Sequence, residues 1–341
     1  MAEWWSVELL NRDDYSMGEL GRVRSGSLEW STFRAVQGSG SLALTEGGDL
    51  TPHWLSDRVA IWHHAGDTRT QFGVWLVTKP GVEVDGPVAR ATLGLVDKTQ
   101  LLNQACGRWV TYDAGTPVVA AVVGIVASRG ETRANIEPST ETLRAALSFE
   151  PSDTWLTIAN KLLDAIGYEG LYASLDGVLS AGPYVAPEGR GIAKVYGPGE
   201  AKMLPSYNDE MDLSEIPNVV YVYAPGDETT PGLIGRASND NPADPFSTVN
   251  RPEEVFSEQV EATSQAAIDA IAVKRLADRQ SVTRRTICTH PLDGTRLGDV
   301  VTHPAGITGA IVQRGLRLEL GAVVEDTVRR IYTAGEELPW I

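Results

Sequence analysis

The sequence predicts a mainly β protein of the α+β class, with a β-barrel or sandwich domain at each end and a mixed α/β region between them. Segments in which apolar and polar residues alternate dominate both ends of the chain, as expected of half-buried strands. Segments that begin with a helix-capping residue and carry apolar residues at three- and four-residue spacing predict helices. Two such segments lie in the middle of the chain, and a third lies nearer its C-terminal end. The longest apolar run, residues 118–127, is too short to cross a membrane.

Two neighbouring segments near the N-terminus share the signature Ser-Gly-Ser-Leu, at residues 25–28 and 39–42. Period-two alternation places Leu42 and Leu44 on one face of a strand. Gly38 and Gly40 indicate a bend or bulge where side chains would crowd. The pattern predicts a β-hairpin of a small barrel or sandwich, and it does not fit a nucleotide-binding loop.

The rest of residues 1–105 continues as a β domain. Residues 59–62 and 72–77 are predicted strands, and the polar segment 64–69 between them predicts a hairpin. Residues 88–96 alternate again, and residues 97–103 are expected to form a short helical exit.

The middle domain, residues 106–215, contains two predicted helices. Thr116 and Pro117 suit the start of a helix that runs to about residue 128. Ser152 or Asp153 can cap a second helix that ends at Gly167. Residues 168–185 form a predicted hairpin, in which Asp-Gly at 176–177 favours a type I′ turn.

The final domain, residues 216–341, is predicted to be β with one helix. Residues 218–223 form a strand, and residues 225–253, rich in Pro, Gly, Asp and Asn, form a long surface loop. Ser264 can cap the helix, whose buried face would carry apolar side chains at helical spacing. The remaining predicted strands span residues 281–289, 299–302, 310–320 and 327–333.

The chain is acidic, with 45 acidic and 29 basic residues and a net charge of −16 among 341 residues. This charge argues against a surface that binds the phosphate backbone of a nucleic acid. Two interpretations of the charge stay open: it serves solubility alone, or it forms an acidic wall that repels DNA and lets it slide past. We expect no membrane insertion and no secretory signal. Cys106 and Cys288 match no metal-binding spacing, and whether they pair is left open.

No catalytic, cofactor-binding or metal-binding residues are predicted. The sequence contains no phosphate-binding loop, zinc-protease helix or nucleophile elbow. His63 and His64 are adjacent in a strand, so they point to opposite faces and cannot easily share one metal ion. Asp13-Asp14, residues 209–212 and Glu253-Glu254 are interpreted as ordinary solvated acidic residues. Gly189-Arg190-Gly191 is an incomplete dinucleotide fingerprint.

Nine tryptophans are concentrated in the first third of the chain. Trp62, Trp75 and Trp155 lie on predicted strands or a helix and are expected in the core. Trp4, Trp5 and Trp340 lie near the chain ends. Because aromatic side chains often anchor protein interfaces, these three are the candidates for subunit contacts.

The order of several short motifs resembles a known family. They are residues 5–12, the two Gly-Ser-Leu segments at 26–28 and 40–42, Gly-Pro-Tyr-Val-Ala-Pro at 182–187, Ile-Pro-Asn-Val-Val-Tyr-Val at 216–222, and the helix segments 264–270 and 277–278. The chain resembles minor tail proteins of long-tailed (siphovirus-type) phages of high-GC bacteria, the tail hub or baseplate hub family. The match departs from the family pattern at Gly182 and Ala186.

The resemblance implies a structural, non-enzymatic virion protein at the tail tip, made in the host cytoplasm. It implies a homotrimer in which two tail-tube-type β-barrel domains per subunit form a pseudo-hexameric ring. The ring would close the tail tube and form part of the DNA ejection channel, without binding the DNA specifically. Implied partners are the distal tail protein, the tape-measure protein, and distal tail fibre or receptor-binding proteins. No cofactor is implied.

Three other functions stay open at this stage. A distal tail protein would form a hexameric ring with one tube domain and an outer sandwich, although the middle helices favour the hub. A carbohydrate-binding module would expose tryptophans on one sheet face. A hydrolase would gather carboxylates or histidines in a pocket, and no motif in the sequence supports one.

Overall fold

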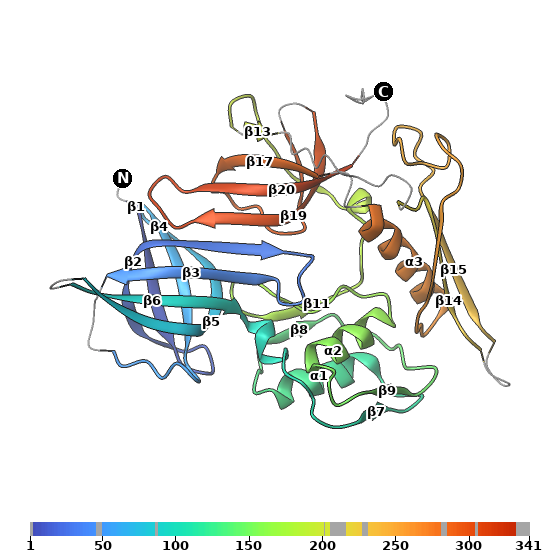
Figure 1. Ribbon diagram of the computed structural model, residues 1–341, viewed down its shortest axis with the longest axis horizontal. Helices are drawn as coiled ribbons and strands as arrows, with labels where there is room; N and C mark the ends of the chain where they lie inside the picture. Colours follow the sequence, from blue (N-terminus) through green and yellow to red (C-terminus); the bar gives the residue numbers. More distant parts are fainter. Residues whose placement is uncertain are drawn as a thin grey trace.

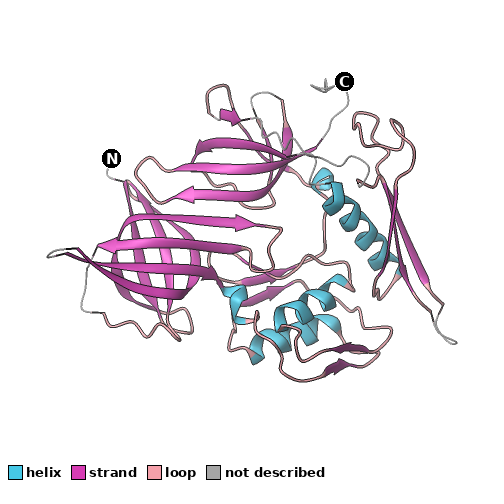
Figure 2. Ribbon diagram, viewed as in Figure 1, coloured by secondary structure: helices cyan, strands magenta, loops and turns pink. Residues whose placement is uncertain are grey.

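The computed structural model describes residues 3–45, 50–85, 88–200, 202–204, 216–226, 231–280, 285–303 and 306–331. Within these residues the protein is mainly β, and strands outnumber the three α-helices (Figures 1 and 2). The predicted α+β, mainly β class is therefore correct. No helix among these residues is long and apolar enough to cross a membrane.

The N-terminal strands pair in a closed cycle. β1 pairs with both β2 and β4, and the cycle continues from β4 through β5, β6 and β3 back to β2. Their side chains enclose a core that includes Leu28, Leu42 and Trp75. The six strands are β1 (Glu3–Leu10), β2 (Ser16–Ser31), β3 (Gly38–Thr45), β4 (Arg58–Ala65), β5 (Thr68–Asp85) and β6 (Val88–Asp97).

The predicted hairpin between the two Ser-Gly-Ser-Leu segments is confirmed as β2 and β3. Leu28 lies opposite Gly40, and Gly26 lies opposite Leu42. A Cβ added to Gly40 would lie only 2.7 Å from Leu28 Cδ2, so the glycine makes room for the leucine opposite. The expected bend or bulge at Gly38 and Gly40 is wrong, because the irregularity in this pairing lies between Val23 and Ser25.

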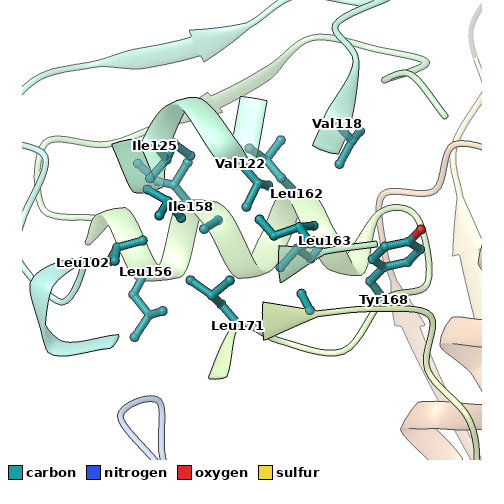
Figure 3. Packing of buried hydrophobic residues seen from close by; sticks show 14 of the residues in the cluster. Leu102, Val118, Val122, Ile125, Leu156, Ile158, Leu162, Leu163, Tyr168 and Leu171 are labelled. Carbon is teal, nitrogen blue, oxygen red and sulfur yellow. The ribbon is translucent and has the colours of Figure 1, made fainter. Parts of the chain in front are cut away.

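The middle of the chain folds around two short helices, below the N-terminal strands in Figure 1. Leu102, Val122 and Leu162 are fully buried where the helices and small sheets meet (Figure 3). The elements are the 3₁₀ helix η1 (Lys98–Leu101), β7 (Val110–Tyr112), α1 (Val118–Ser128), β8 (Ala134–Ile136), β9 (Leu147–Phe149), α2 (Trp155–Asp164), β10 (Tyr172–Ala173), β11 (Leu179–Ala181) and the 3₁₀ helix η2 (Pro187–Gly189).

Both predicted middle helices are present, and the short helix predicted at residues 97–103 is present as η1. The capping residues of the two middle helices differ from the predicted ones. Thr154, not Ser152 or Asp153, caps α2, because its hydroxyl accepts the Thr157 amide at 3.0 Å. Pro117 occupies the cap position of α1, and no side chain caps that helix. Gly167 has a φ of +71°, as predicted for a glycine that ends a helix.

The hairpin β10–β11 is confirmed, but its turn is not type I′. A type I′ turn needs positive φ at both central residues. Here Gly177 has a φ of +82°, and Asp176 is not left-handed. The Ser174 hydroxyl instead accepts the Val178 amide at 3.0 Å, so a side chain supports the turn.

The C-terminal part divides between two sheets. β14 (Val219–Ala224), β15 (Leu233–Ser238) and β16 (Val255–Gln259) form one sheet, covered by α3 (Gln265–Gln280). The Ser264 hydroxyl accepts the Ala267 amide at 3.2 Å, which confirms the predicted cap. The long-loop prediction for residues 225–253 missed β15, because pairing with β14 stabilises a strand that its own composition disfavours.

The last strands form an open row beside the N-terminal cycle. Their order is β12-β18-β19-β20-β17-β13, and β19 also pairs with β2. The two sets of strands thus share one continuous sheet. The strands are β12 (Ile192–Val195), β13 (Lys202–Leu204), β17 (Arg285–Pro291), β18 (Val300–Thr302), β19 (Thr308–Arg317) and β20 (Val323–Ile331).

The contact between the β10–β11 turn and the N-terminal strands gives a first prediction. Gly177→Ala should destabilise the protein by about 2–4 kcal/mol, since its Cβ would lie 2.6 Å from Val74 Cγ2 and the backbone is left-handed. Gly115→Ala is the matched control, because Gly115 has a φ of +83° with nothing within 4 Å of its Cβ. Urea unfolding should show a smaller loss of unfolding free energy for the control variant. Equal losses in the two variants would contradict the predicted clash.

Candidate functional site

The three tryptophans predicted at subunit contacts have different positions. Trp5 is only 2% exposed, and its indole N–H donates to the Glu319 carbonyl at 3.1 Å. Trp5 therefore belongs to the protein's own core, and the expectation of a subunit contact is corrected for this residue. Strand alternation turns Trp4 outward, where it is half-buried and stacked on His64 with 4.6 Å between ring centroids. Trp340 lies outside the described residues.

His63 and His64 lie on opposite faces of β4, as predicted. The His63 ring packs on Trp5 and hydrogen-bonds Glu3 at 2.8 Å, whereas His64 pairs with the Ser6 hydroxyl at 2.9 Å. Across the described ranges, no group of three histidine, cysteine, aspartate or glutamate side chains is arranged to hold a metal ion. The two cysteines are not bonded to each other.

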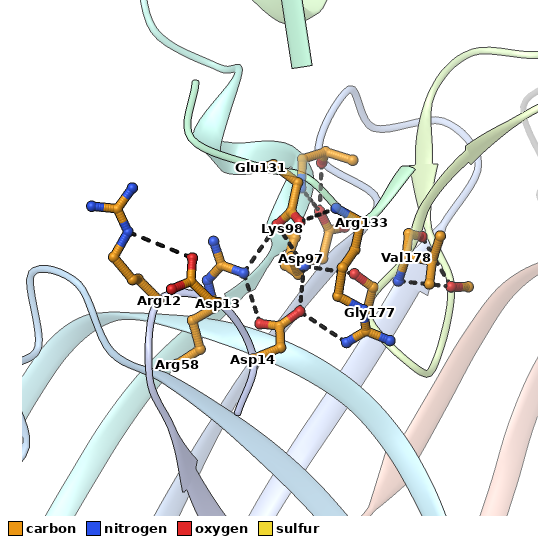
Figure 4. A network of polar contacts seen from close by, with 12 residues as sticks. Arg12, Asp13, Asp14, Arg58, Asp97, Lys98, Glu131, Arg133, Gly177 and Val178 are labelled. Carbon is orange, nitrogen blue, oxygen red and sulfur yellow. Dashed lines mark hydrogen bonds and ion pairs between the residues drawn. The ribbon is translucent and has the colours of Figure 1, made fainter. Parts of the chain in front are cut away.

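A buried ionic network lies where the segment after α1 meets the N-terminal strands (Figure 4). Asp14 lies in the turn between β1 and β2. Its carboxylate oxygens lie 2.7 Å from the Arg58 guanidinium, 2.7 Å from the Lys98 ammonium and 3.0 Å from the Arg133 guanidinium. Glu131, just after α1, accepts both Arg58 and Lys98. The side chains of Asp14, Arg58, Lys98 and Glu131 are each 4% exposed or less, so the charges pair inside the protein.

Asp14 is therefore not the ordinary solvated residue that the sequence suggested. Burial opposes its ionisation, but hydrogen bonds and positive charge from Lys98 and Arg58 outweigh that effect and hold the pKa of Asp14 below its usual value. Its φ of +64° is the only positive value among the described residues other than glycines. This backbone conformation points to a constrained turn, and the signal was absent from the sequence pattern.

The network joins parts of the chain that are far apart. Asp14 lies in the turn between β1 and β2, Arg58 begins β4, Lys98 begins η1, and Glu131 and Arg133 lie between α1 and β8. Lys98 also donates to the Gly177 carbonyl at 2.7 Å. Because each buried charge has a partner of opposite sign, the network can hold the segment after α1 in one orientation against the N-terminal strands.

A second buried polar cluster lies in the C-terminal sheet. The Asp326 carboxylate on β20 lies 2.6 Å from the Arg314 guanidinium and 3.0 Å from the His290 ring. Nearby, the Tyr196 hydroxyl donates a hydrogen bond to the Asp293 carboxylate at 2.9 Å. Burial raises the pKa of Asp326, but Arg314 and His290 more than reverse this and lower it. A His–Asp pair can serve catalysis, but here Arg314 occupies the same carboxylate and His290 is fully buried.

Arg190, between Gly189 and Gly191, has a structural role. Its guanidinium donates to Glu169 at 3.0 Å and to the carbonyls of Val185 and Gly298, both at 2.8 Å. These contacts tie the η2 segment to the loop between α2 and β10 and to the loop before β18. The segment is not a phosphate-binding loop, since the arginine is already occupied by groups of the same chain.

Solved structures of other proteins share the fold of this chain. The chain is similar to a tail protein from Neisseria meningitidis MC58, with a TM-score of 0.64, 12% identity and 96% coverage of both chains. It is similar to the 43 kDa tail protein of prophage MuSo2 from Shewanella oneidensis, with a TM-score of 0.59, 12% identity and coverage of 95% of this chain and 98% of that one. The chain has the fold of phage tail proteins.

A third solved structure extends the likeness beyond phages. It is the E. coli c3393 protein, described as a component of the type VI secretion system with structural similarity to T4 bacteriophage tail proteins gp27 and gp5. The TM-score is 0.53 with 10% identity, over 92% of this chain and 74% of that one. No family model matches the chain, and no curated protein matches it in sequence.

The buried ionic network gives a second prediction. Lys98→Met should lower the free energy of unfolding by about 3–5 kcal/mol, because it leaves two buried carboxylates short of a cation. Arg34→Met is the control, since Arg34 pairs with Glu29 at 3.4 Å on the surface, and it should cost less than about 1 kcal/mol. Similar losses in urea unfolding would show that the network contributes no more than a surface pair.

Proposed function

We propose that this protein is the structural hub of a siphovirus-type phage tail tip. It would close the tail tube, organise the distal tail proteins and form part of the channel through which DNA leaves. The observation that carries the proposal is the likeness of fold to a tail protein over 96% of both chains. The likeness to a secretion component itself described as similar to gp27 and gp5 adds support.

The arrangement of strands supports a ring of subunits. One subunit offers a closed cycle of six paired strands and, beside it, an open row of six. Three copies would therefore contribute six such sets, which suits a trimer that continues a six-fold tube. Because β2 and β19 pair directly, the two sets within a subunit keep a constant relative position.

Charge and buried polar chemistry are consistent with a passive, non-enzymatic role. The net charge of −16 suits a channel wall from which DNA is repelled. The polar clusters described above are occupied by contacts within the chain. We propose that the partners are copies of this chain, a distal tail protein, a tape-measure protein and tail fibre or receptor-binding proteins.

The copy number in the assembled tail tests the hub. A cryo-electron-microscopy reconstruction of the particle that contains this chain, with symmetry tested and not imposed, should show three copies at the tail tip. Each copy should place two strand sets in the ring beneath the tube. Six copies with one set each in the ring would indicate a distal tail protein instead. Absence from the tail would overturn the structural role.

Trp4 is the remaining candidate for a subunit contact within the described residues. Trp4→Ala should weaken assembly by about 2 kcal/mol, or roughly 30-fold, if Trp4 anchors the interface. Trp109→Ala is the control, because Trp109 is 69% exposed in the middle domain. The measurement is the fraction of particles that carry each variant, by quantitative mass spectrometry. Equal incorporation of both variants would exclude an anchoring role for Trp4.

A further inference from the structure

Strand β12 is a weakly held edge of the C-terminal sheet. Within the part of the chain that the structure describes, its four residues pair only with β18, in parallel and with one irregularity. Ile192, Ala193 and Val195 are exposed, so the strand buries little apolar surface of its own. Something beyond the strand must therefore hold it against the sheet.

Tyr196, the residue after β12, is the anchor. It is 3% exposed, and its amide donates to the Thr302 carbonyl at 2.8 Å. Its hydroxyl donates to Asp293 at 2.9 Å, and Lys194 of β12 binds the same carboxylate at 3.0 Å. The C-terminal end of β12 is thus held by one buried ring and one carboxylate, whereas Arg190 ties the segment before β12 to Gly298.

The Tyr196 ring lies against two buried histidines. It stacks on His303, with 5.0 Å between centroids and 14° between planes, and it lies 4.8 Å from His290. His290 is bonded to Asp326, but neither ring nitrogen of His303 has a hydrogen-bond partner within the described residues. His303 is 2% exposed, so a second proton on its ring would create a buried charge with no acceptor.

Among the described residues, the two carboxylates of this cluster, Asp293 and Asp326, are already paired with other groups. Lys194 on β12 pairs with Asp293 after β17, and Arg314 on β19 pairs with Asp326 on β20. His290 on β17 already hydrogen-bonds Asp326. A charged His303 would therefore add an uncompensated positive charge beside the tyrosine that anchors β12.

We propose that protonation of His303 releases Tyr196 and, with it, strand β12 from the edge of the C-terminal sheet. The strand is then an acid-sensitive latch. Its release uncovers the edge of β18, which is a ready site for pairing with another strand. This inference concerns the chain itself and is independent of the proposed place in a tail.

The direction of the pH dependence follows from burial. Burial and the neighbouring His290 lower the pKa of His303 more than Asp326 raises it, so the docked state favours the neutral ring. Docking is therefore complete above about pH 6.5, the ordinary value for histidine, and weakens as the pH falls below it. The equilibrium constant for release should rise by up to about tenfold per pH unit until the ring is protonated in the docked state as well.

Hydrogen exchange between about pH 5 and pH 8 tests the latch. The Tyr196 amide is the reporter, and its protection factor, corrected for the intrinsic pH dependence of exchange, should fall by up to about tenfold per unit of acidification. Amides of α2 should keep their protection, which separates local release from global unfolding. Constant protection at Tyr196, or an equal loss in α2, would overturn the proposal.

Two variants identify the group that titrates. His303→Phe keeps an aromatic ring for Tyr196 to stack on but cannot be protonated, so the protection of Tyr196 should become independent of pH. His303→Gln provides a second neutral side chain if the first variant folds poorly. His53→Phe is the matched control, because His53 is exposed and hydrogen-bonds Ser56, and it should respond to acid like the unaltered protein. An acid response that survives in His303→Phe and His303→Gln would overturn the assignment.

Discussion

The pairing of β2 with β19 is the constraint on which the rest of the structure depends. Ser27–Ser31 of β2 pair with Gln313–Arg317 of β19, while the other edge of the same β2 segment pairs with β3. This contact joins the two ends of the chain in one sheet, so everything between them forms a loop of more than 250 residues closed by strand pairing. Closing so long a loop costs conformational entropy, which the shared core around Leu28 and Leu316 must offset.

Polar contacts hold the enclosed parts in place. Three junctions within the described residues carry paired charges, and the paired groups come from segments far apart in sequence. They are Asp14 with Lys98, Arg58 and Arg133 at the N-terminal strands, Asp164 with Lys274 and Arg275 between α2 and α3, and Arg329 with Glu188 between β20 and η2. Ionic junctions of this kind set orientation more than they add stability, because desolvation offsets much of the attraction.

Local sequence patterns predicted the elements more reliably than their partners. The β2–β3 hairpin, α1, α2, α3 and the glycine that ends α2 were each predicted from residues within one short window. β15 was missed, because its strand conformation depends on β14. The significance of Asp14 was also missed, since the cations that bind it lie 44 to 119 residues away. No spacing rule connects residues whose contact depends on how two domains dock.

The sequence by itself determined the class of the fold, because alternation, helical spacing and capping residues act through neighbours in the chain. It also determined the acidic character and the shared face of Leu42 and Leu44. Tertiary structure alone decided that Trp5 is a core residue, that the first and last strands share a sheet, and that His303 is buried beside Tyr196. Those outcomes depend on contacts between distant segments, whose free energies are settled only when the whole chain is packed.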